Sequence, residues 1–341
     1  MVSGETTTEH EAPTRTPDDS DCPYLGLAPY RRRDRDLFFG RTHATAEFAD
    51  LVREAAGDAS GMVILIGASG AGKSSLLAAG LVPAVSDWDV TTITPGTDPL
   101  TTLAAAYGID GGDLTADDII TALTAQRLDR QRLLIVDQFE EIFTARESES
   151  TRAEFLAALH RCATEHTAAV VLALRADYYA HCLTYSSLQG ALEKRSYILG
   201  PMRPDELAQA VTGPARLAGL ELEPGLDELI IADLCGVGDH HDRHSYDPGL
   251  LPLFSHALAA TWRHRTGHRL TIAGYRSTGG ISNSVGAKDA ARIDPLTREL
   301  PETQPAQRHP NRAGEHRYTT AGAVLLLLFI ALITVGVAAY T

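Results

Sequence analysis

Residues 67 to 74 of the chain read Gly-Ala-Ser-Gly-Ala-Gly-Lys-Ser. An apolar run at 62–66 comes before them, and helix-prone residues at 75–79 come after them. A strand, a loop of the pattern G-x-x-x-x-G-K-[ST] and a helix together form the phosphate-binding loop of nucleotide-binding proteins. This stretch therefore predicts that the protein binds a nucleoside triphosphate.

The composition of this loop suits an anion. Its glycines tolerate positive φ, so that main-chain N–H groups and the helix N-terminus can surround a β-phosphate. Lys73 is expected to reach the β- and γ-phosphate oxygens, and the Ser74 hydroxyl is expected to ligate Mg²⁺. The loop residues expected to bind ATP or ADP are Gly67, Ala68, Ser69, Gly70, Ala71, Gly72, Lys73, Ser74 and Ser75.

Strand-like and helix-like segments alternate along the first part of the chain. Strands are predicted at 62–66, 89–94, 132–137 and 168–174, and helices at 42–56, 75–84, 99–107, 116–128 and 151–166. The uninterrupted apolar runs are typical of strands that are buried on both faces of a parallel sheet. The fold class expected is α/β, with a doubly wound P-loop NTPase sheet.

The pattern changes after Gly200 and Pro201. Helix-like segments at 206–211, 226–235 and 250–265 follow one another without strong strands between them. We therefore expect a smaller helical lid domain beside the nucleotide fold.

An acidic group follows the predicted strand at 132–137. Asp137 ends that strand and is expected to hold the hydration shell of Mg²⁺ together with Ser74. In many ATPases a glutamate comes directly after this aspartate, but here Gln138 does, and two glutamates come later. Either Glu140 or Glu141 can polarise the attacking water, with a slight preference for Glu141. The alternative is that both are solvated residues at the start of a helix.

Arg175 ends the predicted strand at 168–174. The carboxyl ends of parallel strands face the nucleotide crevice, so Arg175 is a candidate sensor of the γ-phosphate and is counted with the catalytic residues. Asp177 lies two residues later. An ordinary ion pair between the two side chains is an equally good interpretation.

Bulk composition narrows the classes of partner. The chain has 341 residues and a formal net charge of -14. Because an acidic protein repels a polyanion, no nucleic-acid partner is expected. Its four cysteines show no C-x-x-C spacing and are expected to be reduced thiols in the cytoplasm. The sequence contains neither an L-S-G-G-Q transporter signature nor an N-K-x-D guanine-recognition motif.

Residues 321–340 are uncharged and apolar on every face. Twenty such residues span about 30 Å as a helix, which matches the hydrocarbon core of a bilayer. Arg308, Arg312 and Arg317 flank the N-terminal side, so the positive-inside tendency places the preceding domain in the cytoplasm. We expect a single-pass, C-terminally anchored membrane protein. A buried core helix is the alternative.

Several short blocks, taken together with these motifs, resemble the novel STAND NTPases. These are bacterial signal-transduction ATPases that are often attached to β-propeller repeats. The resemblance covers about residues 22–285 and is carried by Cys-Pro-Tyr-Leu-Gly-Leu at 22–27, Phe-Phe-Gly-Arg at 38–41, the phosphate loop, Ala-Gly-Leu-Val-Pro at 79–83, Val-Asp-Gln-Phe-Glu-Glu at 136–141, Leu-Arg-Ala-Asp at 174–177, Gly-Pro-Met at 200–202, Gly-Leu-Leu-Pro-Leu at 249–253, Ser-His-Ala-Leu at 255–258, Leu-Thr-Ile-Ala-Gly-Tyr at 270–275 and Gly-Gly at 279–280.

The resemblance implies a molecular switch. An ADP-bound closed form exchanges ADP for ATP, self-associates and is reset by slow hydrolysis. The acidic pattern at 137–141 resembles that of NACHT-type ATPases. By the same resemblance, Pro252 contacts the nucleotide from the helical domain, and Phe39, Gly40 and Arg41 lie beside the adenine. Pro252 is also well suited simply to start a helix.

The expected domain organisation is a disordered tail at 1–21, an NTPase domain at 22–200, a helical lid at 201–270, a truncated winged-helix-like segment at 271–294, a linker at 295–318 and a transmembrane helix at 319–341. Relatives often continue into a winged helix and a repeat array that senses a ligand. The alternatives to a regulated switch are a non-hydrolysing scaffold and a truncated remnant of a larger sensor. The stimulus and the effector protein are not encoded in any motif.

Overall fold

The computed structural model describes residues 22–58, 61–111, 114–126, 129–144, 148–236 and 246–281. The expected tail at 1–21, the linker at 295–318 and the transmembrane helix at 319–341 lie outside the described residues, as do residues 282–294 of the winged-helix-like segment. Within the described ranges, no helix combines the length and the apolar character that a bilayer crossing requires.

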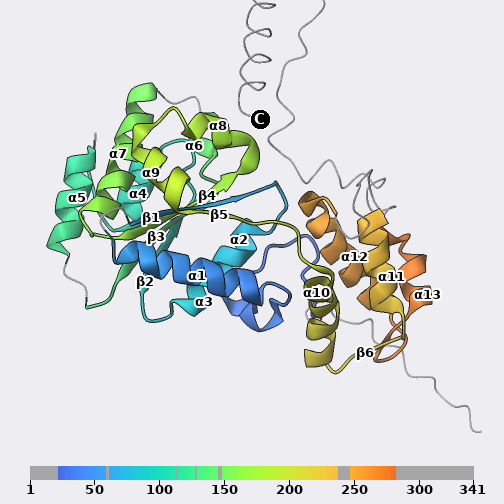
Figure 1. The fold of residues 1–341 in the computed structure, drawn as a ribbon. Helices are drawn as coiled ribbons and strands as arrows, with labels where there is room; N and C mark the ends of the chain where they lie inside the picture. Colours follow the sequence, from blue (N-terminus) through green and yellow to red (C-terminus); the bar gives the residue numbers. More distant parts are fainter. Residues whose placement is uncertain are drawn as a thin grey trace, which may run out of the picture. The chain divides into compact units, whose positions relative to one another are not determined.

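A five-stranded parallel sheet forms the centre of the nucleotide fold, with the strand order β2-β3-β4-β1-β5 (Figure 1). Its strands are β1 (Met62–Gly67), β2 (Asp89–Ile93), β3 (Arg132–Val136), β4 (Ala169–Arg175) and β5 (Ser196–Ile198). The α/β class with a parallel sheet is therefore confirmed. Because β4 lies between β1 and β3, the phosphate loop and Asp137 follow strands that are one strand apart.

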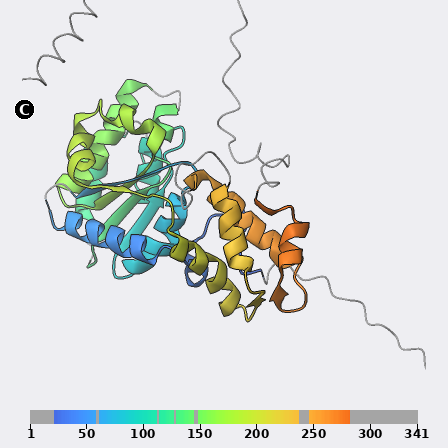
Figure 2. The ribbon, with the colours of Figure 1, turned by 45° about the vertical axis from the view of Figure 1, so that its right-hand side comes forward.

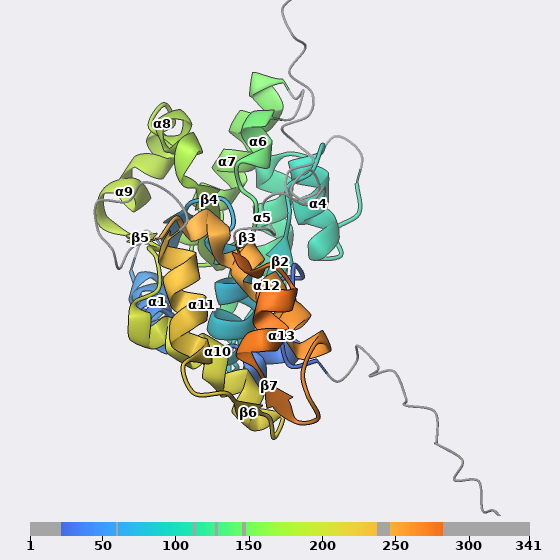
Figure 3. The same ribbon diagram turned by 90° about the vertical axis from the view of Figure 1, so that its right-hand side faces the viewer.

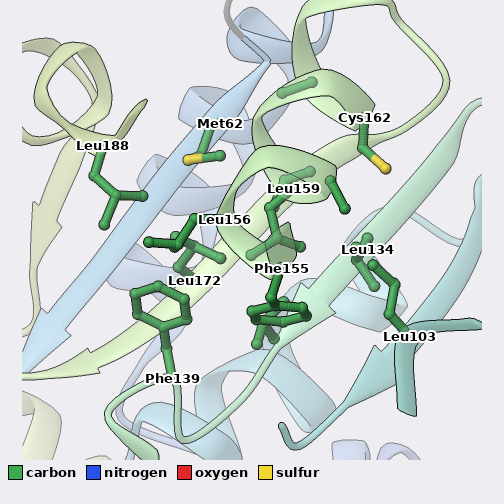
Figure 4. Packing of buried hydrophobic residues seen from close by; sticks show 14 of the residues in the cluster. Met62, Leu103, Leu134, Phe139, Phe155, Leu156, Leu159, Cys162, Leu172 and Leu188 are labelled. Atoms are coloured by element: carbon green, nitrogen blue, oxygen red, sulfur yellow. The ribbon is translucent and has the colours of Figure 1, made fainter. Parts of the chain in front are cut away.

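Alternate residues of each central strand pack on opposite faces of the sheet. In β1, Ile64 and Ile66 belong to one core cluster, whereas Val63 and Leu65 belong to the other. In the first cluster, Phe155 and Leu156 of α7 (Glu149–Thr164) lie against the sheet (Figure 4). Each buried apolar side chain of this size contributes about 1.5–3 kcal/mol to the free energy of folding.

Helices cover both faces of the sheet (Figure 2). One layer holds α1 (Thr42–Ala56) and a continuous helix after the phosphate loop, made of α2 (Lys73–Ser75), a π-helical segment (Leu76–Leu81) and α3 (Val82–Ala84). The other layer holds α4 (Pro99–Ala106), α5 (Ala116–Ala125), α7 and α9 (Ser186–Lys194). Shorter helices at the carboxyl edge are α6 (Glu141–Thr144), a 3-10 turn (Ala176–Tyr178) and α8 (Tyr179–Cys182).

Local sequence explains where several of these helices begin. The side chains of Asp98, Thr115 and Ser148 accept hydrogen bonds from main-chain N–H groups in the first turns of α4, α5 and α7. Such caps satisfy N–H groups that have no partner within the helix, and each stabilises its helix by about 1 kcal/mol.

The helical part follows the sheet, and Figure 3 shows its elements together. It contains α10 (Pro204–Leu217), α11 (Leu226–Gly236), a 3-10 turn (Pro248–Leu250), α12 (Leu251–Arg263), α13 (Ile272–Ser277) and a short parallel pair, β6 (Glu221–Leu222) with β7 (Arg269–Leu270). Tyr275 of α13 and Ile281 share one apolar core with α10, α11 and α12. The described residues of the expected winged-helix-like segment therefore pack as part of the helical domain.

The N-terminal segment also joins that helical core. Tyr24 is 3% exposed, and its hydroxyl donates a hydrogen bond of 2.6 Å to the carbonyl oxygen of Val211 in α10. The chain then continues through a 3-10 helix (Arg32–Leu37) to α1 under the sheet. Residues 22–41 therefore contact both parts of the molecule.

Candidate functional site

The phosphate-loop sequence lies between β1 and α2 at the carboxyl edge of the sheet (Figure 1). Gly70 and Gly72 have φ of +76° and +91°, in the region that side chains with a Cβ rarely adopt. A Cβ on Gly72 would meet no heavy atom within 4 Å, so the space beside this residue is open. The positive φ of Gly70 and Gly72 therefore explains why this turn contains glycines.

Lys73 is only 9% exposed, although it carries a charge. Its Nζ donates to the main-chain oxygens of Gly67 at 2.9 Å and Ala68 at 3.0 Å. Burial lowers the pKa of the ammonium group, while the negative charges of Glu140 and Asp137 act in the opposite direction. The lysine is thus held inside its own loop and close to the acidic residues.

Asp137 directly follows β3 and is half-buried. Its main-chain N–H donates to the Ile93 oxygen at 2.9 Å, and its Oδ1 accepts from the N–H of Gln138 at the same distance. Gln138 has φ of +54°, an uncommon value for a residue that is not glycine. The chain changes direction at this turn, directly before Phe139, Glu140 and Glu141.

Glu140 and Glu141 occupy different environments. Glu140 is 8% exposed, and its Oε2 accepts a hydrogen bond of 3.2 Å from the N–H of Arg175. Burial raises the pKa of its carboxyl group, against the lowering effect of Lys73. Glu141 instead accepts a hydrogen bond of 3.0 Å from the N–H of Gly96, in the loop after β2. Glu140 therefore lies among the charges of the site, and Glu141 braces a neighbouring loop.

Arg175 is the last residue of β4 and is in register with Gly67, the first residue of the phosphate loop. Its guanidinium forms two hydrogen bonds to the Asp177 carboxylate, of 3.2 Å from Nε and 2.8 Å from an Nη, and lies over the Tyr178 ring. The ion pair considered from the sequence is present. The strand register also puts the main chain of Arg175 beside the phosphate loop.

The helical part reaches the phosphate loop at Gly70. A Cβ on Gly70 would lie 3.0 Å from the Gly249 oxygen and 3.3 Å from Cδ of Pro252. Pro252 also lies in the first turn of α12. Pro252 therefore lies next to the phosphate loop and also at the start of a helix, so the two interpretations of this residue are compatible.

Phe39 and Gly40 lie against α10, and Arg41 follows them. The Phe39 ring fills the space beside Gly213, where a Cβ would come within 2.4 Å of the ring. Gly40, at φ of +82°, lies so close to the main chain of Glu206 that a Cβ would be 2.4 Å from its oxygen. Arg41 is 4% exposed and donates to the main-chain oxygens of Gly200 and Ala71.

The residues present fit a Mg²⁺–nucleotide. A buried ammonium, an N-terminal helix turn and a glycine-containing loop with positive φ at Gly70 and Gly72 suit phosphate oxygens. Mg²⁺ in such sites is held by one or two protein oxygens together with phosphates, a role that suits Ser74 and Asp137. The Ser75 hydroxyl is already engaged, because it accepts the N–H of Tyr30 at 3.2 Å.

Sequence reasoning missed three parts of this site. Gly249 contacts the phosphate loop, Tyr30 contacts Ser75, and Gln138 turns the chain. Gly249 belongs to a sequence block shared with the resembling family, which is the only signal that pointed toward it.

A parallel sheet whose first strand leads into this loop, with an aspartate after the strand two positions away, defines a P-loop NTPase. The model of the family described as Novel STAND NTPase 1 matches residues 23–307. The chain belongs to this family, and it is accordingly a nucleotide-binding P-loop NTPase of the STAND type.

Three solved structures illustrate similar folds. The Aeropyrum pernix ORC2 protein shares 15% identity, with 75% of this chain and 71% of that chain covered and a TM-score of 0.49. The RuvB Holliday junction branch migration motor of Thermotoga maritima shares 16% identity, with coverage of 79% and 78% and a TM-score of 0.48. Cdc6p of Pyrobaculum aerophilum shares 16% identity, with coverage of 77% and 67% and a TM-score of 0.46. No curated protein matches the chain.

Proposed function

We propose that the protein is an ATP-binding STAND-type signalling switch that hydrolyses ATP slowly with Mg²⁺. The observation that supports this proposal best is the contact between Gly70 of the phosphate loop and Gly249 and Pro252 of the helical domain. A ligand that moves the loop must also act on the helical domain, because packed contacts of this kind are not freely deformable. The product of turnover is then a conformational state.

Five residues of the site have a role in this proposal: Lys73, Ser74, Asp137, Glu140 and Arg175. Lys73 stabilises negative charge on the β- and γ-phosphates, while Ser74 and Asp137 hold Mg²⁺, which neutralises charge on the transferred group. Glu140 orients the attacking water and accepts its proton, since its burial raises its pKa toward the working pH. Arg175 senses the γ-phosphate after leaving Asp177.

The ion pair between Arg175 and Asp177 supports slow turnover. Both of its hydrogen bonds must break before the guanidinium can turn toward a phosphate. A bidentate pair of this type has good geometry and restricts the arginine to one direction. In this proposal, Arg175 therefore reaches the γ-phosphate only after the end of β4 has rearranged.

Nucleotide state and self-association are linked in this proposal. The ADP form is expected to be a monomer and the ATP form an oligomer. The first test is to identify the nucleotide that copurifies with the full chain. The second is to measure the molar mass of the protein by light scattering, once with ADP and once with a non-hydrolysable ATP analogue. A monomer in both states would contradict the switch.

A non-hydrolysing scaffold, or a remnant of a larger sensor, is the second candidate. The observation that favours it is the engagement of Arg175 by Asp177, which leaves the γ-phosphate without that cation. Single-turnover phosphate release separates the two proposals. Release that needs Mg²⁺ and is lost in Glu140→Gln supports the enzyme, and no release supports the scaffold.

We also propose that residues 319–341 anchor the protein in a membrane, with the NTPase domain in the cytoplasm. The support is the uncharged run at 321–340 with arginines before it. Cell fractionation with alkaline carbonate extraction tests the proposal. Recovery of the full chain in the carbonate-soluble fraction would contradict it.

A further inference from the structure

The guanidinium of Arg41 joins two separate parts of the main chain. One Nη donates to the oxygen of Gly200 at 3.0 Å, and the other donates to the oxygen of Ala71 at 3.3 Å. Ala71 belongs to the phosphate loop, whereas Gly200 lies in the connection between β5 and α10. A single side chain therefore links the nucleotide loop to the connection at 199–203 that leads into the helical domain, which we call the hinge.

Burying the charged guanidinium of Arg41 costs free energy, which its two hydrogen bonds offset. Arg41 is 4% exposed, and both of these acceptors are neutral carbonyl groups. A buried charge is tolerated only when its donors are well satisfied, and the planar fork of arginine suits two acceptors in fixed positions. Packing alone would be satisfied by an apolar side chain.

The two residues before Arg41 hold its main chain against α10. Gly40 approaches the oxygen of Glu206 so closely that only a residue without Cβ fits, and the Phe39 ring occupies the space beside Gly213. Both contacts are on α10. The arginine thus reaches the phosphate loop from a segment that is already seated on the first helix of the helical domain.

We propose that Arg41 is a positioning residue that couples the phosphate loop to the hinge at Gly200, so that nucleotide binding and the placement of α10 are energetically linked. This inference rests on the proposed nucleotide binding. It predicts reciprocal coupling: a ligand that fixes the loop stabilises the hinge, and a hinge that is fixed raises nucleotide affinity.

The hinge contains amides that report on its state. The N–H of Leu199 donates to Ile66, and the N–H of Met202 donates to the buried hydroxyl of Tyr246 at 2.8 Å. In the full wild-type chain, saturating ADP is expected to slow hydrogen exchange both in the phosphate loop and at 199–203. We expect about tenfold slowing at the hinge, because a loop fixed by ADP holds Ala71 in place, so that Arg41 can no longer move with the hinge and opening must break its hydrogen bond to Gly200.

Arg41→Met keeps the bulk of the side chain and removes its donors. The ADP concentration is raised until the phosphate loop of the variant is as protected as that of the wild type, and exchange at 199–203 is then expected to be no slower than without ADP. Arg132→Met is the matched control. Arg132 is 5% exposed, and its guanidinium also donates to main-chain oxygens, those of Leu123, Gln126 and Thr167, at the other ends of the strands. The control should retain the wild-type response at the hinge.

The outcomes separate the two proposals. No protection of the wild-type phosphate loop would overturn nucleotide binding itself. Protection of the loop together with an unchanged hinge response in Arg41→Met would overturn the coupling, and so would an equal loss in Arg132→Met. If Arg41→Met does not fold, Arg41→Lys gives the same test, because an ammonium lacks the fork that spans both carbonyls.

Discussion

Glu140 and Arg175 are joined by a hydrogen bond of 3.2 Å, in which the main-chain N–H of Arg175 donates to Oε2 of the glutamate. The bond ties the turn after β3 to the end of β4, next to the first residue of the phosphate loop. A carboxylate held in this place by main-chain geometry is preorganised, which is what a proton acceptor needs.

Glu140→Gln is expected to lower the single-turnover rate of phosphate release by about 10²–10⁴-fold, because the amide cannot accept a proton from water. Nucleotide affinity should change little, since glutamine can still accept the N–H of Arg175. The matched control is Glu141→Gln, whose carboxylate bonds to the N–H of Gly96, and its rate should fall by less than about tenfold. A larger loss in Glu141→Gln would assign the role to that residue.

Stability should depend on pH through Glu140. Burial raises the pKa of its carboxyl above the ordinary 4.5, so the folded protein binds this proton more tightly than the unfolded chain does. Its contribution to the free energy of unfolding is complete below pH 4.5 and is lost as pH rises through the folded-state pKa. Glu140→Gln should therefore gain stability relative to wild type between about pH 5 and pH 8. Urea unfolding of both proteins at about pH 5 and about pH 8 measures this change. If variant and wild type differed by the same free energy of unfolding at both pH values, the explanation would be contradicted.

Gly70 and Gly72 provide a matched pair in the phosphate loop. Both have positive φ, so alanine at either position should lower the free energy of unfolding by about 1–2 kcal/mol. Gly70→Ala should cost more, because its Cβ would press on Gly249 and Pro252, whereas a Cβ on Gly72 meets nothing within 4 Å. Urea unfolding gives both values. Equal losses would argue that the helical domain does not press on the loop.

The strands with the strongest local signal were predicted well. In β1, β3 and β4 every residue or nearly every residue is buried, and such strands produce apolar runs that are visible in the sequence. The edge strand β5 was missed. Its three residues are half-buried or exposed, so they produce neither an apolar run nor a clear alternation.

The candidate site could be located from the sequence where its residues belong to local motifs. Lys73, Ser74 and Asp137 belong to motifs whose spacing is fixed by the strand and the loop. The different hydrogen-bond partners of Glu140 and Glu141 were not predictable, because the two side chains follow a left-handed turn at Gln138 and bond to distant segments of the chain. Tyr24 was assigned to the NTPase domain, but its hydroxyl bonds to Val211, and no local pattern encodes a contact across 187 positions.

The central claim is that the phosphate loop binds a nucleotide through Lys73, and calorimetric titration of the full chain with ADP and with Mg²⁺ and an ATP analogue tests it most directly. Lys73→Ala is expected to abolish the binding signal, because the buried ammonium stabilises the phosphate charge. Lys194→Ala, which removes an equal charge from the exposed end of α9, should bind as wild type does. An affinity that is unchanged in Lys73→Ala would contradict the account.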